Sequence, residues 1–410
     1  MRHHRRVPGK AAPFEVEIEK LVFGGEGLGR HEGQVVFVPF TVPGDRVEVR
    51  PIERKRGFIR AVVTRLLAPG PGRSVPPCPH FGRCGGCQWQ HVDYALQVET
   101  KRKILEELFQ HHFPEARKLF ISMKACPHPF GYRSRARMQL RDDGTGLKPG
   151  FFRYRSRAVE PIEACPLFRP ALNEALERLR RECREKGLPP GATDLELACA
   201  GDGSWALAAG TGEPAAAELH PDKALLMPVG DFVYSVTAAV FFQANEFVVP
   251  ELVQTVLGLA AKGNAALDLY AGVGLFTLPL AQRYERVVAV EGSPDAHRLA
   301  IKNASTAGAG NVECVCADVE DWMEAVGSLA PPAYDLILLD PPRTGAGSAV
   351  MKGLEMWAPE TILYVSCDPQ TLVRDLLHLP ARDYQIDFVG GLDMFPETYH
   401  FETVVRLKRR

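Results

Sequence analysis

The second half of the chain, from Phe241 onward, alternates apolar segments of strand length with segments that read as helices. The apolar segments lie at 265–269, 286–290, 311–315, 334–339, 361–365, 383–389 and 401–407. Strands and helices that alternate in this way build a doubly wound sheet whose strands are mostly parallel. The pattern therefore predicts an α/β fold, in which ligands bind beyond the carboxyl ends of the strands.

The N-terminal part of the chain is predicted to form a small β-barrel. Between residues 14 and 67, valine and isoleucine fall in short runs that glycines and a Pro-Gly turn interrupt. This pattern is typical of five-stranded barrels of the OB type, which often bind single-stranded nucleic acid but in many proteins serve only in packing. The expected organisation is a basic tail at 1–12, the barrel at 13–67, a central α+β domain at 68–235 and the α/β domain at 236–410.

The charge of the chain is balanced overall, and its basic residues are clustered. The formal net charge is −1, which excludes a polycation. The clusters are a run at 54–56 and two rows with arginine at every second position, Arg133, Arg135, Arg137 and Arg153, Arg155, Arg157. On a strand, this spacing places each row on one face, which would suit an RNA surface, and a solvated edge strand is the alternative.

The chain contains ten cysteines and no apolar segment long enough for a signal peptide or a membrane span, so a cytoplasmic, reducing setting is expected. Cys78, Cys84 and Cys87 are spaced by five and two residues, and Cys165 lies far downstream. Four cysteine ligands suit zinc or an iron–sulfur cluster, and the five-residue gap favours the cluster. The remaining cysteines except Cys367 are expected to be small buried residues, namely Cys126, Cys183, Cys199, Cys314 and Cys316.

A glycine-rich loop at 268–274 follows the first strand of the α/β half. The next strand ends in Glu291, which is placed to accept the two ribose hydroxyls of a nucleoside, and the third leads to Asp318, which is placed to take the adenine amino group. Acids at successive strand ends favour S-adenosylmethionine over the dinucleotide of a dehydrogenase. For Asp318, a helix N-cap is the alternative.

Three further residues suggest covalent chemistry at the same end of the sheet. Asp340 follows an apolar strand and precedes two prolines that stiffen the turn. Cys367 lies at the tip of the next strand, just before Asp368-Pro369, and Glu402 provides a carboxylate on a later strand. A nucleophile beside a methyl donor suggests methylation through a covalent adduct with a base.

Together these motifs resemble the RNA uracil-5-methyltransferase family over nearly the whole chain. The barrel resembles its TRAM domain, and Phe241-Phe242-Gln243-Ala244-Asn245 resembles its glutamine motif. The segments 340–343, 366–369 and 402–404 resemble its three catalytic motifs. The chain departs from the family pattern at Ala271 and Leu275, where Cys and Asn are common, and at Asp368, where Asn is more usual.

The resemblance implies a fold, an activity and a role for each residue. It implies a Rossmann-like donor domain, with Cys367 as the nucleophile and Glu402 as the base that removes the carbon 5 proton. The donor contacts that it implies are Gln243, Tyr270, Glu291 and Asp340, with Asp340 also near the target base; Gly272 and Asp318 are expected at the donor from the glycine loop and the strand ends. A 4Fe-4S cluster would be held by Cys78, Cys84, Cys87 and Cys165. A free cysteine has a pKa of about 8.5, so local activation of Cys367 is expected.

The expected substrate is 23S ribosomal RNA, because the family members that act on tRNA in some bacteria lack the barrel and the cysteine cluster. The same reaction on tRNA is the second hypothesis. A non-catalytic RNA-binding protein is the alternative of another class, and the intact set Asp340, Cys367 and Glu402 disfavours it. A radical-type methylthiotransferase is disfavoured by the cysteine spacing. The protein is expected to be a monomer.

Overall fold

The computed structural model describes residues 12–142, 146–185, 194–209, 223–327 and 333–410. Apart from its last residue, the predicted basic tail 1–12 lies outside these ranges. The chain divides into two compact units. Unit 1 consists of Met1–Ile104, Phe151–Ile162 and Phe395–His400, and unit 2 consists of Leu105–Gly150, Glu163–Met394 and Phe401–Arg410.

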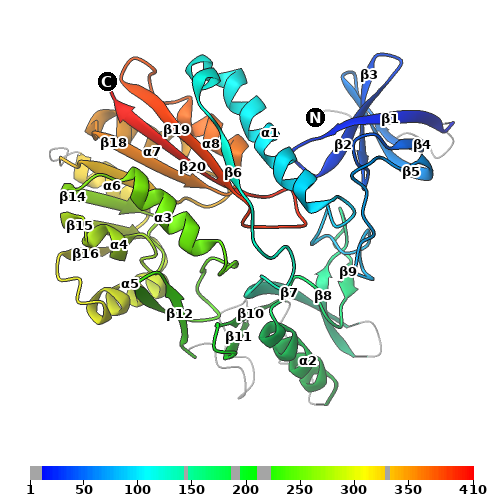
Figure 1. Cartoon of the computed structure of the whole chain (residues 1–410). Coiled ribbons are helices and arrows are strands. Elements are labelled where there is room, and N and C mark those ends of the chain that lie inside the picture. The colour runs from blue at the N-terminus through cyan, green and yellow to red at the C-terminus, as the bar shows by residue number, and fades with distance from the viewer. Residues whose placement is uncertain (1–11, 143–145, 186–193, 210–222, 328–332) are drawn as a thin grey trace. The chain divides into compact units, whose positions relative to one another are not determined.

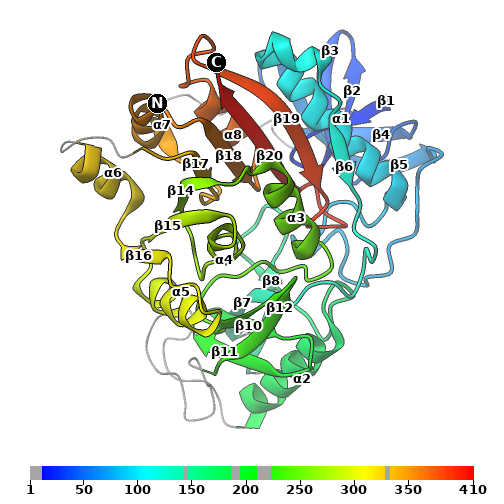
Figure 2. The ribbon, with the colours of Figure 1, turned by 60° about the vertical axis from the view of Figure 1, so that its left-hand side comes forward.

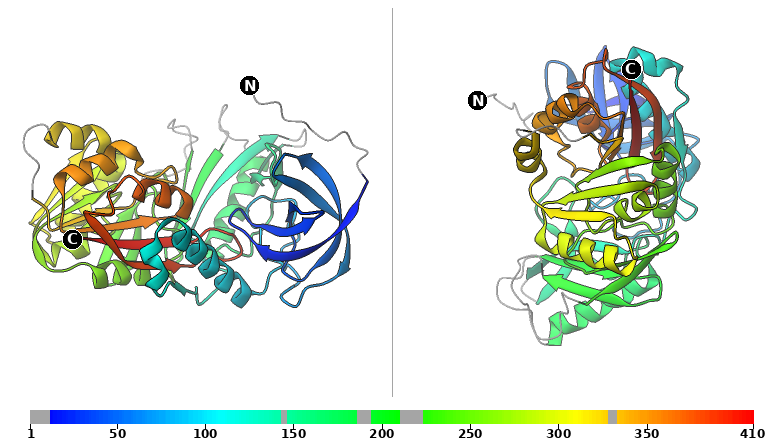
Figure 3. Two further views of the ribbon diagram at one scale, coloured as in Figure 1. Left: turned by 90° about the horizontal axis from the view of Figure 1, so that it is seen from above. Right: turned by 90° about the vertical axis from the view of Figure 1, so that its left-hand side faces the viewer.

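Unit 1 contains the predicted barrel, whose five strands appear in blue in Figure 3. The strands close in the order β1-β2-β3-β5-β4, which confirms the prediction. Their bounds are β1 Phe14–Leu21, β2 Glu26–His31, β3 Gln34–Pro39, β4 Arg46–Arg54 and β5 Phe58–Ala68. Every second residue points inward, so the core is a set of small apolar side chains: Val16, Ile18, Val36, Val38, Val47, Val49, Ile59 and Ala61.

Glycine is required where the first two strands of the barrel approach each other. A Cβ atom on Gly29 would lie 2.3 Å from the carbonyl oxygen of Glu17. Gly29 also pairs with Ile18 at the position where the register of β1 shifts. A side chain at this position would therefore push β1 and β2 apart.

Unit 2 is built on an eight-stranded sheet with the order β16-β15-β14-β17-β18-β20-β19-β6. The bounds are β14 Gly263–Leu269, β15 Tyr284–Glu291, β16 Val312–Cys316, β17 Leu336–Leu339, β18 Thr361–Ser366, β19 Tyr384–Leu392 and β20 Glu402–Arg409. These strands confirm the predicted α/β sheet. β20 runs antiparallel to both of its neighbours. The edge strand β6, Ser122–Lys124, pairs in parallel with β19 and was not predicted.

Helices cover both faces of this sheet. α3 Val249–Leu259, α4 Thr277–Ala281 and α5 Pro294–Thr306 lie on one face, and α6 Val319–Gly327, α7 Gly347–Trp357 and α8 Pro369–Leu376 lie on the other (Figure 2). From β14 the chain first adds strands on one side, β15 and β16, and then strands on the other side, β17 and β18. Because crossovers between parallel strands are right-handed, this change of direction places the later helices on the opposite face. The central strand β17 is buried along its whole length between these layers, so its sequence, Leu336–Leu339, is continuously apolar.

The remaining elements are labelled in Figure 1 or lie between labelled ones. A five-stranded sheet has the order β11-β10-β7-β8-β9, and β12 and β13 form a hairpin. The bounds are β7 Arg135–Asp142, β8 Leu147–Phe152, β9 Val159–Pro161, β10 Asp194–Cys199, β11 Trp205–Ala209, β12 Leu225–Val229 and β13 Phe232–Val236. The helices are α1 Tyr94–His112, the 3-10 helix η1 Pro114–Lys118 and α2 Pro170–Glu185.

The predicted arginine rows do not form free basic faces. Arg135 is buried, and its guanidinium donates hydrogen bonds of 2.6–3.2 Å to the carbonyl oxygens of Thr237, Ala238 and Val240. Arg137 forms an ion pair with Asp194. Arg135 is therefore structural, because its side chain satisfies three buried carbonyl groups.

The second row differs from the prediction as well. Arg153 and Arg155 follow β8 in a turn, where they form ion pairs with Glu160 and Glu26 at 3.0 and 2.9 Å. Much of their charge is therefore balanced within unit 1. The basic run at 54–56, in contrast, is exposed on the connection between β4 and β5.

The prediction of buried cysteines is partly confirmed. Cys126, Cys183 and Cys199 are buried. Cys314 is half-buried and Cys316 is exposed, so the prediction was wrong for these two. Both lie on β16, which is an edge strand of the sheet and is open to solvent along one side.

Among the described residues, no helix is both long enough and apolar enough to cross a membrane.

Candidate active site

The residues predicted to bind the donor and to react lie in a row at the carboxyl ends of the parallel strands of the eight-stranded sheet. In strand order, they are Asp318 after β16, Glu291 at the end of β15, Tyr270 after β14, Asp340 after β17, Cys367 after β18 and Glu402 at the start of β20. Because β20 is antiparallel, its first residue lies at the edge where the parallel strands end. Asp340, Cys367 and Glu402 therefore belong to three consecutive strands, which are spaced by about 4.8 Å.

The glycine loop makes a sharp turn after β14. Tyr270, Gly272 and Gly274 have positive φ angles of 62°, 56° and 92°. A positive φ angle costs energy for tyrosine, and such strain is often found at functional sites. A Cβ atom on Gly272 would meet nothing within 4 Å, so the turn has open space beside its backbone.

Glu291 holds this turn from the neighbouring strand. Its Oε2 accepts a hydrogen bond from the amide of Gly272 at 2.8 Å, and its Oε1 accepts one from the amide of Ser293 at 2.7 Å. Each carboxylate oxygen has a further lone pair, so Glu291 can still accept hydrogen bonds from a ligand.

Asp318 is the N-cap of α6, as the alternative interpretation predicted. Its Oδ1 accepts hydrogen bonds from the amides of Glu320 and Asp321 at 2.9 and 3.3 Å. The side chain is exposed at the sheet edge. Capping fixes its orientation and leaves the other carboxylate oxygen for a further contact.

Asp268 lies beneath the glycine turn and is fully buried. Its Oδ2 accepts a hydrogen bond of 2.6 Å from the hydroxyl of Thr277, and its Oδ1 has no hydrogen-bond partner among the described residues. Burial raises the pKa of Asp268 to about 7, and the nearby Glu291 adds to this shift.

Gln243 is buried in the segment between β13 and α3. Contacts on either side hold this segment. The amide of Ser134 donates to the carbonyl oxygen of Ala244 at 2.8 Å, and the Asn245 side chain donates to the carbonyl oxygen of Met394 at 3.0 Å. Phe241, two residues before Gln243, is 74% exposed.

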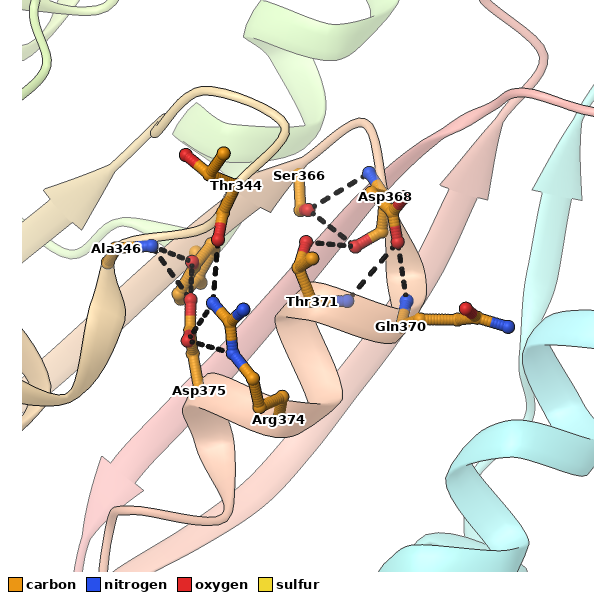
Figure 4. Close-up of polar contacts among 9 residues, drawn as sticks. Thr344, Ala346, Ser366, Asp368, Gln370, Thr371, Arg374 and Asp375 are labelled. Atoms are coloured by element: carbon orange, nitrogen blue, oxygen red, sulfur yellow. Dashed lines mark hydrogen bonds and ion pairs between the residues drawn. The ribbon is translucent and has the colours of Figure 1, made fainter. Parts of the chain in front are cut away.

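Cys367 lies between the end of β18 and the start of α8, and hydrogen bonds hold Ser366 and Asp368 on either side of it (Figure 4). Asp368 is the N-cap of α8, since its Oδ1 accepts from the amides of Gln370 and Thr371 at 2.9 and 3.2 Å. The hydroxyl of Ser366 donates to the carbonyl oxygen of Asp368 at 3.0 Å. Aspartate at position 368 therefore has a clear local role.

The surroundings of Cys367 disfavour its thiolate. Burial raises its pKa to about 12, and the carboxylates of Glu402, Asp340 and Asp368 add to this shift. Arg343 acts in the opposite direction. The sequence predicted that the Cys367 thiol is activated locally. The structure shows a raised pKa instead, and Arg343 is a positive charge that favours the thiolate.

The carboxyl groups of Glu402 and Asp340 also have raised pKa values. For Glu402, burial is the main cause, the carboxylate of Asp340 adds to it, and Arg343 lowers the pKa. For Asp340, loss of hydration is the main cause, and the carboxylate of Asp268 adds to it. Glu402 is 3% exposed, and its Oε2 has no hydrogen-bond partner among the described residues.

The predicted metal ligands are not gathered into a cluster by the structure. Cys78, Cys84 and Cys87 lie on one connection in unit 1, and Cys165 belongs to unit 2. Within the ranges that the structure describes, no group of three or more His, Cys, Asp or Glu side chains is placed to hold a metal ion.

Two residues with evident effects on the site had no role in the sequence prediction. Arg343 belongs to the motif at 340–343, and its positive charge could have suggested that it lowers the pKa of Cys367 and Glu402. Asp375, on α8, binds the loop that follows Asp340, and no local sequence signal identifies it. Its importance becomes visible only when the loop and the helix are seen together.

A glycine turn with positive φ angles lies beside a row of acids and one cysteine at the carboxyl ends of the strands, where α/β enzymes bind their ligands. Residues 222–410 match the tRNA (Uracil-5-)-methyltransferase family, and residues 13–64 match the TRAM domain. The 23S rRNA (uracil(1939)-C(5))-methyltransferase RlmD of Klebsiella pneumoniae is 33% identical, over 94% of this chain and 93% of its own. An uncharacterised RNA methyltransferase of Thermosynechococcus vestitus is also 33% identical, over 97% and 98% of the two chains.

A solved structure is similar over the same extent. It is the tRNA (uracil-54, C5)-methyltransferase of Pyrococcus abyssi in complex with S-adenosyl-L-homocysteine, which is 26% identical with a TM-score of 0.74 and covers 96% of this chain and 99% of its own. The chain belongs to the RNA uracil-5-methyltransferase family.

Proposed function

We propose that this protein methylates carbon 5 of a uridine through a covalent bond between Cys367 and the base. The observation that carries the proposal is the placement of Asp340, Cys367 and Glu402 on consecutive strands at one sheet edge, beside the glycine turn. In this proposal Cys367 is the nucleophile and Glu402 is the base, and their position beside the glycine turn supports these roles.

The residues of the sheet edge fit S-adenosylmethionine. Glu291 and Asp318 offer acceptors for ribose hydroxyls and an adenine amino group, and Tyr270 and Gly272 form the open turn beside them. Burial raises the pKa of Asp340, and a positively charged ligand nearby would favour its carboxylate. Buried Gln243 is a further donor contact in this proposal. When bound, S-adenosylmethionine supplies a methyl group from a sulfonium.

The chain's own residues perform the covalent steps. The Cys367 thiol first loses its proton, and the thiolate then adds to carbon 6 of uracil, which turns the ring into an enolate whose carbon 5 is nucleophilic. After carbon 5 has gained its methyl group, Glu402 takes the carbon 5 proton, and the bond between sulfur and carbon 6 breaks. A carboxylate with a raised pKa suits this role, because a base is most effective when its pKa is near the working pH.

We propose 23S ribosomal RNA as the substrate. The support is the printed activity of relatives such as the Klebsiella enzyme, which match nearly the whole chain. The tRNA activity of the Pyrococcus enzyme keeps tRNA as the second candidate. The exposed basic run at 54–56 on the barrel offers contacts to RNA phosphates. Methylation of deproteinised 23S RNA and of total tRNA, each prepared from cells that lack the enzyme, distinguishes the two substrates.

We also propose a 4Fe-4S cluster on Cys78, Cys84, Cys87 and Cys165. The support is the cysteine spacing together with two hydrogen bonds that hold the turn between Cys84 and Cys87. The amide of Gly85 donates to the carbonyl oxygen of Phe152 at 2.8 Å, and the amide of Gly86 donates to the sulfur of Cys84 at 3.4 Å. Protein purified without oxygen is expected to contain about four iron atoms and to absorb visible light. Cys165→Ser should remove both signals, and Cys316→Ser should preserve them.

A further inference from the structure

Asp375 connects the loop that follows Asp340 to helix α8 (Figure 4). Its Oδ2 accepts hydrogen bonds from the amide of Ala346 and from the hydroxyl of Tyr364, both at 2.7 Å. Its Oδ1 accepts from the guanidinium of Arg374 at 2.7 Å. The side chain is fully buried, so these bonds are not exchanged for bonds to water.

Arg374 adds a second connection to the same loop. Its Nη2 donates to the carbonyl oxygen of Thr344 at 2.6 Å, and it is held by the carboxylate of Asp375. Gly345, between the two anchored residues, has a φ angle of 81°, and a Cβ atom there would lie 2.3 Å from Oδ2 of Asp375. The loop therefore lies directly against the carboxylate.

The anchored loop carries Arg343. The two residues that bind this loop, Tyr364 and Asp375, lie close to Cys367 in the sequence. Tyr364 is on β18, three residues before Cys367, and Asp375 is on the helix that follows it. The amide of Gly345 donates to the carbonyl oxygen of Pro342 at 2.8 Å, which closes the turn around Arg343. Arg343 is exposed and forms the positive charge that favours the Cys367 thiolate.

We propose that Asp375, together with Tyr364, is a positioning residue that fixes the Arg343 turn beside Cys367 and thereby sets the reactivity of this thiol. The proposal rests on the proposed role of Cys367 as the nucleophile. A buried carboxylate that merely stabilises the fold would affect unfolding, and it would leave the reactivity of Cys367 in the folded protein unchanged.

The test measures alkylation of Cys367 by iodoacetamide in the full-length, RNA-free protein between pH 7 and 10, followed by mass spectrometry of the Cys367 peptide. Asp375→Asn should slow alkylation about tenfold, which corresponds to one pKa unit. Arg343→Met should slow it equally. Both changes remove the effect of the Arg343 charge on Cys367, so the double variant should be alkylated no more slowly than either single variant.

Asp335→Asn is the matched control. Asp335 accepts hydrogen bonds from the amides of Asn264 and Ala265 at the opposite end of the same sheet. Its replacement should lower stability without changing alkylation. If Asp375→Asn does not fold, Tyr364→Phe removes one bond of the network and should slow alkylation by a smaller factor.

The proposal is overturned if the folded Asp375 or Tyr364 variant is alkylated as fast as the Asp335→Asn control, or if the effects of Asp375→Asn and Arg343→Met multiply. Failure of the proposed function gives a different result. In that case, Cys367→Ala would still methylate RNA, whatever the alkylation rates of the other variants.

Discussion

Ser366 on β18 pairs with Thr403 on β20, and Cys367 and Glu402 are the next residues along these two strands, close enough for Glu402 to raise the pKa of the Cys367 thiol. The nucleophile and the base are therefore neighbours across two adjacent strands, although they belong to distant parts of the sequence. Burial raises the pKa of the Cys367 thiol and of the Glu402 carboxyl, the nearby acids add to both shifts, and Arg343 opposes them.

Replacement of Glu402 by glutamine should trap the RNA on the enzyme. The amide cannot take the carbon 5 proton, so the methylated adduct with Cys367 would persist and turnover should fall by a factor of about 10² to 10⁴. A denaturing gel with labelled RNA measures the adduct. Glu313→Gln, on the surface of the same sheet, is the control and should turn over normally. Rapid turnover by the Glu402 variant would assign the proton transfer to another group.

Asn303 should be needed for donor binding, although it lies outside the recognised motifs. Its side-chain amide donates to the carbonyl oxygens of Val273 and Ser235 at 3.0 and 3.3 Å, which holds the glycine loop from α5. Asn303→Ala should weaken S-adenosylmethionine binding about tenfold, or about 1.4 kcal/mol, in isothermal titration calorimetry. Asn311→Ala removes two similar bonds to carbonyl groups away from the loop and should preserve the affinity. Equal affinities of the two variants would contradict the role of Asn303.

The stability of the protein should depend on pH through Asp268. Its pKa is raised from 3.8 to about 7 by folding, so the folded state holds this proton more tightly than the unfolded state. The stabilisation is therefore complete below pH 3.8 and is lost as the pH rises to about 7. Asp268→Asn lacks this titration.

Urea unfolding of the ligand-free protein between pH 4 and 8 measures the effect. The free energy of unfolding of the wild type should fall relative to that of Asp268→Asn as the pH rises. Parallel curves for the two proteins would show that Asp268 does not titrate in this range.

Gly29→Ala should destabilise the barrel by about 1–3 kcal/mol, because a close contact between strands has to be relieved. The added Cβ atom would lie 2.3 Å from a carbonyl oxygen of β1. Gly57→Ala is the control in the same barrel, since a Cβ atom there would meet nothing within 4 Å and its φ angle is not positive. Thermal unfolding should show a lower midpoint for Gly29→Ala alone, and equal midpoints would argue against the close contact.

The parts of the fold that were predictable are those with a regular apolar pattern. The period-two valines at 36–38 and 47–49 indicated the barrel, and the fully apolar Leu336–Leu339 indicated a buried parallel strand. Strand β6 has three residues and no such pattern, so its addition to the sheet depends on tertiary contacts. The burial of Arg135 was not predictable either, because its partners are carbonyl groups some hundred residues away in the chain.

The candidate site shows the same division. Asp340, Cys367 and Glu402 were identified because each ends or begins a recognisable strand. Asp375 was not, because a buried acid on a helix has no local signature until the loop that it binds is known. The raised pKa of Cys367 likewise depends on burial and on neighbouring acids that come together only in the folded sheet.

The most direct test of the account is a covalent trap with RNA that contains 5-fluorouridine. Fluorine cannot leave carbon 5 as a proton does, so the adduct with Cys367 should persist after methyl transfer. We expect a stable protein–RNA complex with the wild type and none with Cys367→Ala, and sequencing of the bound RNA identifies the modified uridine. RNA that binds the wild type without any covalent complex would contradict the account and favour a protein that binds RNA without modifying it.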